Sequence, residues 1–208
     1  MHPDRVFLND TLFVLHAASK LDWPDLTRTN FQKILYFCSI LCPIEKLHWG
    51  YYFVNAAYGP FNRQIHQASD ILVAHRFASI EELVIQKDSK IRARYKITEV
   101  GRQEVAKIIK LQREQARSEW IYRIMKVLDI YGQTVITKLA YKEPTFHKMR
   151  LHNRGGVIAA GNDENESMTL LQQIDTELQK RYSIKLDTTA AKLITFFNYL
   201  STDIGREK

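Results

Sequence analysis

The sequence has no apolar run long enough to cross a membrane and only two cysteines in 208 residues. A membrane-spanning helix needs roughly 18 or more consecutive apolar residues. The first residues, MHPDRVFLND, are polar and lack the charged start and apolar segment of a secretory signal. We therefore expect a cytoplasmic protein that does not enter the membrane.

The scarcity of cysteine also bears on metal binding. Cys38 and Cys42 lie four residues apart in an apolar segment, so a helix would place them on one face. A structural zinc site needs about four ligands, and the nearest histidine, His48, lies beyond Pro43. The sequence predicts two buried free thiols, no metal and no other cofactor.

Short catalytic motifs are missing as well. The chain contains no Gly-x-Ser-x-Gly, His-Glu-x-x-His or Cys-x-x-Cys motif. The segment GGVIAAG lacks the Gly-Lys-Ser/Thr ending of a phosphate loop. We name no catalytic residue and expect a protein that is not an enzyme. An enzyme whose site is assembled from distant residues is the least favoured alternative.

The composition is that of a globular protein with a basic balance. Hydrophobic residues make up 45% of the chain and charged residues 25%, as in ordinary globular domains. The 30 Lys and Arg exceed the 23 Asp and Glu by 7. Such a balance fits binding to nucleic acid, to an acidic membrane surface or to an acidic protein. The positions of the charges must decide among these partners.

Hydrophobic periodicity predicts two helices at the start of the chain. The first covers residues 9–21, with Asn9 or Asp10 as its cap. The second opens at Thr27 or Thr29, ends at Pro43 and is apolar enough to lie at the centre of the core. Residues 48–54, HWGYYFV, are aromatic and favour a short strand.

Tyr58-Gly-Pro-Phe61 predicts a sharp entry to a third helix that runs from about Phe61 to about Arg76. Gly59 adopts backbone angles that other residues avoid, and proline suits the first position of a helix. We expect Tyr58 and Phe61 to anchor the core. Ile65, Ala68 and Leu72 form an inward stripe, and the polar residues of the first turns face elsewhere.

Residues 82–97 predict a basic β-hairpin. The strands are 83–87 and 91–97, with a turn at Asp88-Ser89. Ala93, Tyr95 and Ile97 alternate with Arg92, Arg94 and Lys96, so the two sets lie on opposite faces of the second strand. Between residues 87 and 96, five basic residues stand against one acidic residue, a local charge of +4.

The remainder of the chain predicts further helices. One begins at the cap Thr98 and runs to Tyr131, with Gly132 as its stop and a break at 117–119 as an alternative. Residues 133–152 hold a short helix and another turn, 153–166 a surface loop, and 164–182 and 188–203 two final helices. The last helix carries the apolar stripe Leu193, Phe196, Phe197, Leu200 and Ile204.

This order of elements indicates a mainly α chain with a small β-hairpin, of class α+β. We expect a winged helix-turn-helix over residues 1–118 and a helical C-terminal region over 119–208, either separate or packed on the first as one unit. The last helices either pair with a second copy or a partner chain, in a homodimer or hetero-complex, or pack on the chain's own core.

Two resemblances support this interpretation. The segment RYKITEVGRQEV, residues 94–105, resembles the wing-to-helix junction of MarR and PadR regulators, where Tyr-x-Leu-Thr-x-x-Gly is common. The blocks at 31–37, 57–61 and 94–102 resemble Panacea-type antitoxin domains and related winged-helix proteins of mobile elements and phage defence. They cover roughly the first half of the chain. This resemblance implies a protein that binds DNA or a protein partner without catalysis.

The predicted DNA contacts lie on the third helix and the hairpin. Base edges would be read near the start of that helix, by Arg63, Gln64, His66 and Gln67. Phosphates would be bound by the hairpin residues Lys87, Lys90, Arg92, Arg94 and Lys96. Asp70, on the same helix face, opposes close approach of DNA. The alternative for both sets is an ordinary solvated surface.

Two functions follow from these observations. The first is a regulatory protein that binds duplex DNA through the hairpin and the third helix. The second is an adaptor or antitoxin-like subunit of a phage-defence or toxin–antitoxin complex. In that case the basic hairpin would contact an acidic protein partner or have no binding role.

Overall fold

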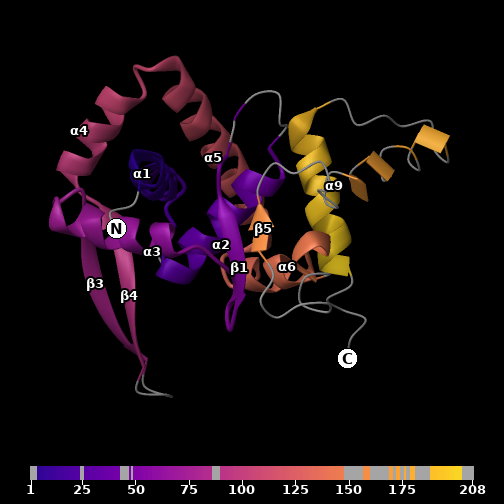
Figure 1. Ribbon diagram of the computed structural model, residues 1–208, viewed down its shortest axis with the longest axis horizontal. Coiled ribbons are helices and arrows are strands. Elements are labelled where there is room, and N and C mark those ends of the chain that lie inside the picture. The colour runs from indigo at the N-terminus through magenta and orange to yellow at the C-terminus, as the bar shows by residue number, and fades with distance from the viewer. Residues whose placement is uncertain are drawn as a thin grey trace.

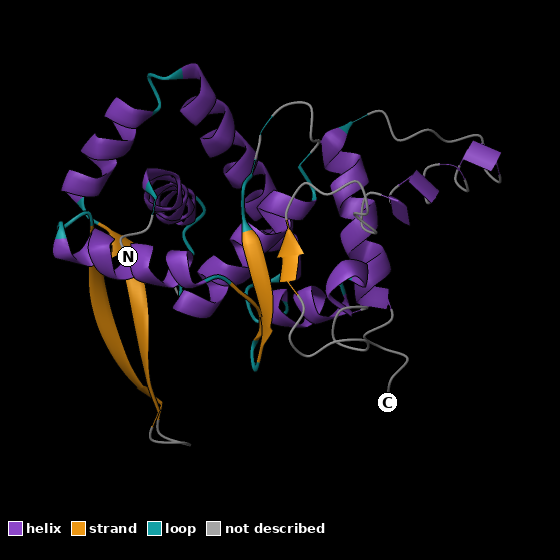
Figure 2. Cartoon of the chain, in the orientation of Figure 1, coloured by secondary structure: helices purple, strands orange, loops and turns teal. Residues whose placement is uncertain are grey.

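A computed structural model describes residues 4–23, 26–42, 47, 49–85, 90–147, 157–159 and 188–202, and isolated positions between 169 and 180. At 82–85, 90–92 and 157–159 it describes the backbone alone. The described part of the chain is mainly helical with two small antiparallel hairpins, which confirms the predicted α+β class (Figure 2).

Three helices and a following hairpin come in the order that the sequence predicted for a winged helix. The helices are α1 (Arg5–Lys20), α2 (Arg28–Ile40) and α3 (Arg63–Ala74), and the hairpin consists of β3 (Ala78–Ile85) and β4 (Lys90–Ile97). α3 packs on α1 and α2 and leads directly into β3. The hairpin, which we call the wing, projects away from the helices (Figure 1).

A second hairpin lies between α2 and α3 and corrects the prediction for Tyr58-Gly-Pro-Phe61. β1 (Tyr52–Ala56) pairs with β2 (Gly59–Phe61) and with β5 (Val157–Ala159), so the sheet order is β2-β1-β5. Gly59, at φ 95°, follows the turn, and Pro60 pairs with Asn55 in the edge strand. An edge strand tolerates proline because one of its sides needs no N–H donor. The segment is therefore a strand and does not start the helix.

Asn62 begins α3 instead. Its side-chain oxygen accepts hydrogen bonds from the backbone N–H of Gln64 at 2.8 Å and of Ile65 at 3.2 Å. The amide of Gln32 on α2 bonds both backbone groups of Asn62, accepting from its N–H at 2.7 Å and donating to its carbonyl at 2.9 Å. The position of α3 is therefore fixed against α2 by paired amides, and its predicted inward stripe is buried.

α1 begins earlier than predicted. Its N-cap is Asp4, and Asn9 and Asp10 lie inside the helix and are buried. Asp10 is bonded to Arg117, and the Asn9 side chain donates to Glu114 at 3.1 Å. Both residues resemble caps in sequence, but here they bind partners more than 100 residues away.

The predicted long helix is two helices that form an arch over α1 (Figure 1). α4 (Glu99–Ile108) has the expected cap Thr98, and α5 (Gln112–Tyr131) ends at Gly132 as expected. The break lies at 109–111 and not at 117–119. The turn brings α5 back over α1 and α2, where Trp120, Ile121 and Ile124 enter the core. The expected domain boundary at 118 falls within α5.

The C-terminal elements pack on the same core. These are α6 (Ile136–Lys142) and α9 (Thr189–Thr202). Four of the five predicted stripe residues of α9 are at most 2% exposed, and the Phe197 ring lies 5.0 Å from that of Phe37 on α2. Ile204 lies outside the described residues. In this chain the stripe therefore contacts α2 and α5 and does not face solvent.

Two other predictions meet the structure here. Cys38 and Cys42 are buried thiols, as expected, and burial raises the pKa of the Cys38 thiol. The segment 153–166, predicted to be a loop, contributes Val157–Ala159 as β5, and its other residues lie outside the described part.

A buried lysine links α2 to the β1–β2 hairpin. Lys33 is 2% exposed, and its Nζ donates to the carbonyl oxygen of Pro60 at 2.9 Å. A Cβ on Gly59 would lie 2.9 Å from this Nζ, so glycine leaves room for the amine. Burial lowers the pKa of Lys33 from 10.5 to about 7.

We expect Lys33 to make stability depend on pH. Between the folded pKa of about 7 and the ordinary value of 10.5, the unfolded chain binds a proton that the folded chain releases. The unfolding free energy should therefore rise with pH in this window, by up to about 1.4 kcal/mol per pH unit from this group. Urea unfolding between pH 7 and 9.5 measures the slope. Lys33→Met should remove it, whereas Lys138→Met, at an exposed position of α6, should retain it.

Candidate nucleic-acid interface

The strand register of the wing gathers cations on one face. Lys96 lies opposite Ser79, Arg94 opposite Glu81, Arg92 opposite Leu83 and Lys90 opposite Ile85. Directly opposed residues of an antiparallel pair share a face. This face, which we call the basic face, carries four cations and the single carboxylate of Glu81, a charge of 4 − 1 = +3.

The other face of the wing is held by the core. Tyr95 and Ile97 are buried, and the backbone N–H of Tyr95 donates to the Leu26 carbonyl at 2.9 Å. The predicted alternation along β4 is thus confirmed at Tyr95, Lys96 and Ile97, whereas Ala93 and Arg94 are both partly buried. Because Tyr95 and Ile97 face inward, the basic face is directed away from the helices.

The wing cations differ in their surroundings. Lys96 is half-exposed and forms an ion pair of 2.9 Å with Glu81, which is also half-exposed. Arg94 is partly buried. Lys90 and Arg92 are placed on the basic face by the backbone register, and Lys87 lies outside the described residues. Four of the five predicted wing residues therefore share one face.

The predicted residues of α3 all lie in its first two turns, but their surroundings differ. Arg63 is exposed at the first helical position. The side-chain oxygen of Gln64 accepts from the backbone N–H of Asp4 at 3.0 Å, and Gln67 is partly buried. Arg63 is the most exposed of the four predicted base-reading residues, so it is the best placed of them to contact a ligand.

His66 belongs to a cluster whose centre is Arg28, a residue that the sequence analysis missed. The Arg28 guanidinium bonds the Tyr95 hydroxyl of the wing and the Asp70 carboxylate of α3, and lies 3.2 Å from His66 Nε2. Burial and the charge of Arg28 lower the pKa of His66. One guanidinium thus joins the first turn of α2 to α3 and to β4.

The position of Arg28 in the sequence could have identified it as a residue that needs a distant partner. It follows the N-cap Thr27 as the first residue of α2. Cations are unfavourable at a helix N-terminus, where the macrodipole favours negative charge. An arginine at this position therefore needs a partner from elsewhere, and Asp70 provides one.

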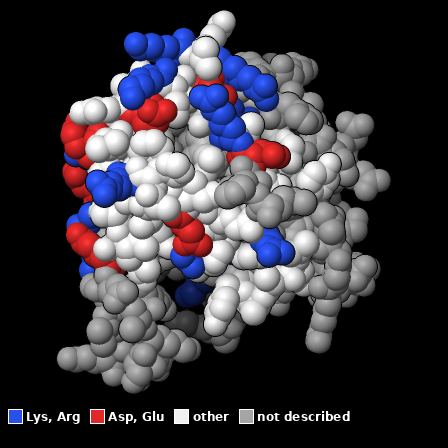
Figure 3. Space-filling model, turned by 60° about the vertical axis from the view of Figure 1, so that its left-hand side comes forward, with Lys and Arg blue, Asp and Glu red and all other residues white. Residues whose placement is uncertain are grey.

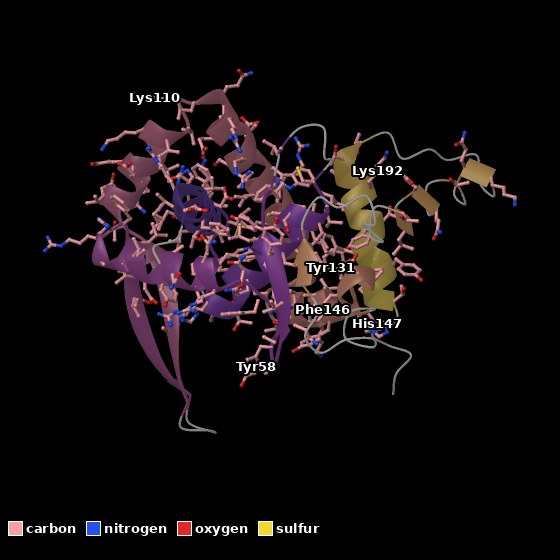
Figure 4. The ribbon with its side chains drawn as sticks, in the orientation of Figure 1. Tyr58, Lys110, Tyr131, Phe146, His147 and Lys192 are labelled. Atoms are coloured by element: carbon pink, nitrogen blue, oxygen red, sulfur yellow. The ribbon has the colours of Figure 1, made fainter. Side chains whose placement is uncertain are left out.

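Cations also gather where α4 meets α5. Lys107, Lys110 and Arg113 are exposed there, and Figure 3 shows basic side chains along the top of this face and mixed charges below. Lys110 marks the place in Figure 4. This corner lies at the opposite end of α4 from the wing (Figure 1).

The β1–β2 hairpin is apolar on its outer side and corrects a second prediction. Tyr58, expected in the core, is 71% exposed, and Tyr52 is 62% exposed. Phe61 is partly buried, with its ring 6.1 Å from that of His66. Tyr58 lies at the tip of this hairpin (Figure 4), which projects to the same side as the wing with α3 between them (Figure 1).

The described residues show neither a metal centre nor a membrane segment. Among them, no group of three or more His, Cys, Asp or Glu side chains is arranged to hold a metal ion. None of the helices in this part of the chain is long and apolar enough to cross a membrane.

Comparisons with known proteins give no match to a family model, to a curated protein or to a solved structure. The resemblances to MarR and PadR regulators and to Panacea-type antitoxin domains therefore remain predictions. Functional inference depends on the geometry described above.

Proposed function

We propose that this chain is a winged-helix regulatory protein that binds duplex DNA. The observation that carries the proposal is the strand register, which places Lys90, Arg92, Arg94 and Lys96 on one face of a projecting hairpin. A helix with an exposed arginine in its first turn lies beside that hairpin. Wing cations would neutralise phosphates, and the start of α3 would approach the bases.

The wing accounts for most of the expected affinity. Each phosphate that a lysine or arginine neutralises releases counterions, so affinity falls as salt rises. The ion pair between Lys96 and Glu81 does not prevent this, since both side chains are about half-exposed and solvent screens their attraction.

We expect a variant with Arg92, Arg94 and Lys96 replaced by alanine to bind duplex DNA at least about tenfold more weakly at low salt. Its plot of log affinity against log salt should be shallower by about one unit for each phosphate that the variant no longer neutralises. Titration of a fluorescent duplex at about 50 mM and about 200 mM salt measures both quantities.

The matched control replaces Lys107, Lys110 and Arg113 at the α4–α5 corner. These three exposed cations change the net charge by the same amount but lie away from the wing. If the corner variant loses as much affinity as the wing variant, net charge and not the wing determines binding. If the wild type does not bind duplex at low salt, the proposed function is wrong.

The second candidate is an adaptor or antitoxin-like subunit that binds a protein partner. The exposed Tyr52 and Tyr58 of the β1–β2 hairpin favour it, because exposed aromatic side chains are enriched at protein interfaces. The salt titration separates the two candidates, since a protein of the second class needs no affinity for duplex DNA.

A further inference from the structure

The cluster around Arg28 joins α3 to the wing, the two elements of the proposed interface. The positive charge of Arg28 itself is neutralised in an ion pair. The Arg28 side chain is 39% exposed and that of Asp70 is 50% exposed. The guanidinium carbon also lies 5.7 Å from the centre of the Tyr95 ring. Tyr95 and His66 orient the guanidinium, and Asp70 neutralises its charge.

The Asp70 carboxylate occupies guanidinium donors of Arg28 that a phosphate can also bind. Arginine binds carboxylate and phosphate through the same planar arrangement of N–H donors, so the two anions compete for one guanidinium. Ion pairs at exposed sites are weak because solvent screens them. A phosphate that reaches the wing root can therefore replace the carboxylate while Tyr95 still holds the Arg28 side chain in place.

We propose that Arg28 is a further phosphate-binding residue, and that Asp70 masks it in the free protein. This inference rests on the proposed function and extends its site to the first turn of α2. Asp70 then acts as an internal competitor, which reduces affinity for every polyanion. The sequence predicts that Asp70 opposes the approach of DNA, and neutralisation of Arg28 gives this effect a specific cause.

The alternative is that Arg28 and Asp70 only position the wing against α3. The two interpretations predict opposite effects of removing the carboxylate. Loss of a competitor strengthens binding, whereas loss of a positioning interaction weakens it. The sign of the change in affinity therefore decides between them.

The experiment measures duplex DNA affinity for Asp70→Asn over a salt series. We expect affinity to rise about two- to fivefold, the range that loss of an exposed ion pair allows. The salt dependence should steepen by about one unit, because one more phosphate is neutralised. In the double variant Arg28→Ala/Asp70→Asn both gains should disappear. Asp70→Ser serves the same test if Asp70→Asn does not fold.

The matched control is Glu104→Gln. This substitution also removes the carboxylate of an ion pair with a basic residue. The pair is Glu104 Oε2 with Lys107 Nζ at 3.2 Å, and it lies on α4, away from α3. It should raise affinity less than Asp70→Asn does. If the two variants gain equal affinity, the loss of one negative charge explains the gain, and the inference is overturned.

The remaining outcomes separate the inference from the proposed function. If the wild type binds and Asp70→Asn binds equally well or more weakly, the masking role is wrong and the proposed function stands. If Asp70→Asn alone binds, the proposed function of the wild type is wrong, whereas masking of Arg28 by Asp70 is supported. If neither binds duplex at low salt, both proposals fail.

Discussion

Replacing Asp10 by alanine should destabilise the fold by about 3–5 kcal/mol, since the change leaves a buried guanidinium without its carboxylate. Asp10 and Arg117 are both fully buried, and Arg117 Nε donates to Asp10 Oδ1 at 2.9 Å. A second guanidinium nitrogen and the Tyr51 hydroxyl bond Asp10 Oδ2. The Trp49 ring covers the guanidinium carbon at 4.0 Å.

Urea unfolding at neutral pH, followed by circular dichroism, measures this loss. The double variant Asp10→Leu/Arg117→Met is the control, because replacing both charges with apolar side chains of similar size is often neutral. It should recover most of the stability that Asp10→Ala removes. A loss below about 1 kcal/mol in Asp10→Ala would be typical of a solvent-exposed pair and would contradict the burial described here.

Gly101→Ala should also destabilise the protein, by about 3 kcal/mol or more. A Cβ at this position would lie 2.2 Å from the carbonyl oxygen of Phe77 and 2.8 Å from Ile97 Cγ1. Phe77 immediately precedes β3, and its carbonyl accepts the N–H of Thr98, so it cannot withdraw without opening the base of the wing. This close approach explains the glycine in RYKITEVG.

The sign of the change in stability distinguishes close packing from helix propensity. Helix propensity alone would make Gly101→Ala stabilising by about 1 kcal/mol. Ala106→Gly, at an exposed position of α4, measures that propensity effect in the same helix and should cost about 1 kcal/mol. Thermal and urea unfolding of the two variants should therefore both show losses, with the larger in Gly101→Ala. A stabilised Gly101→Ala would show that α4 does not pack closely on the wing.

The local sequence determined most of the elements and the alternation of the wing. Thr27 and Thr98 cap α2 and α4 as predicted, and Gly132 ends α5. Buried Tyr95 and Ile97 alternate with exposed Lys96 along β4. These features depend on neighbours a few residues apart, whose relative positions are fixed by the geometry of a helix or a strand.

Only the tertiary structure decided which polar residues are buried in the core and which face solvent. Asp10 and Lys33 resemble a helix cap and a surface cation in sequence, but both are buried. Asp10 binds Arg117, which is 107 residues away, and Arg28 binds Asp70, which is 42 residues away. Tyr58, predicted in the core, is exposed because Gly59-Pro60 belongs to an edge strand and does not start a helix.

The physical reason is the range of the interactions concerned. Capping, turn formation and alternation are set within a few residues, so the sequence alone determined most of the helices, the wing and the alternation along β4. Burial of a charge becomes favourable only when folding supplies a partner, and that partner can lie anywhere along the chain. The buried pair of Asp10 and Arg117, the Arg28 cluster and the break between α4 and α5 were therefore decided by the tertiary structure.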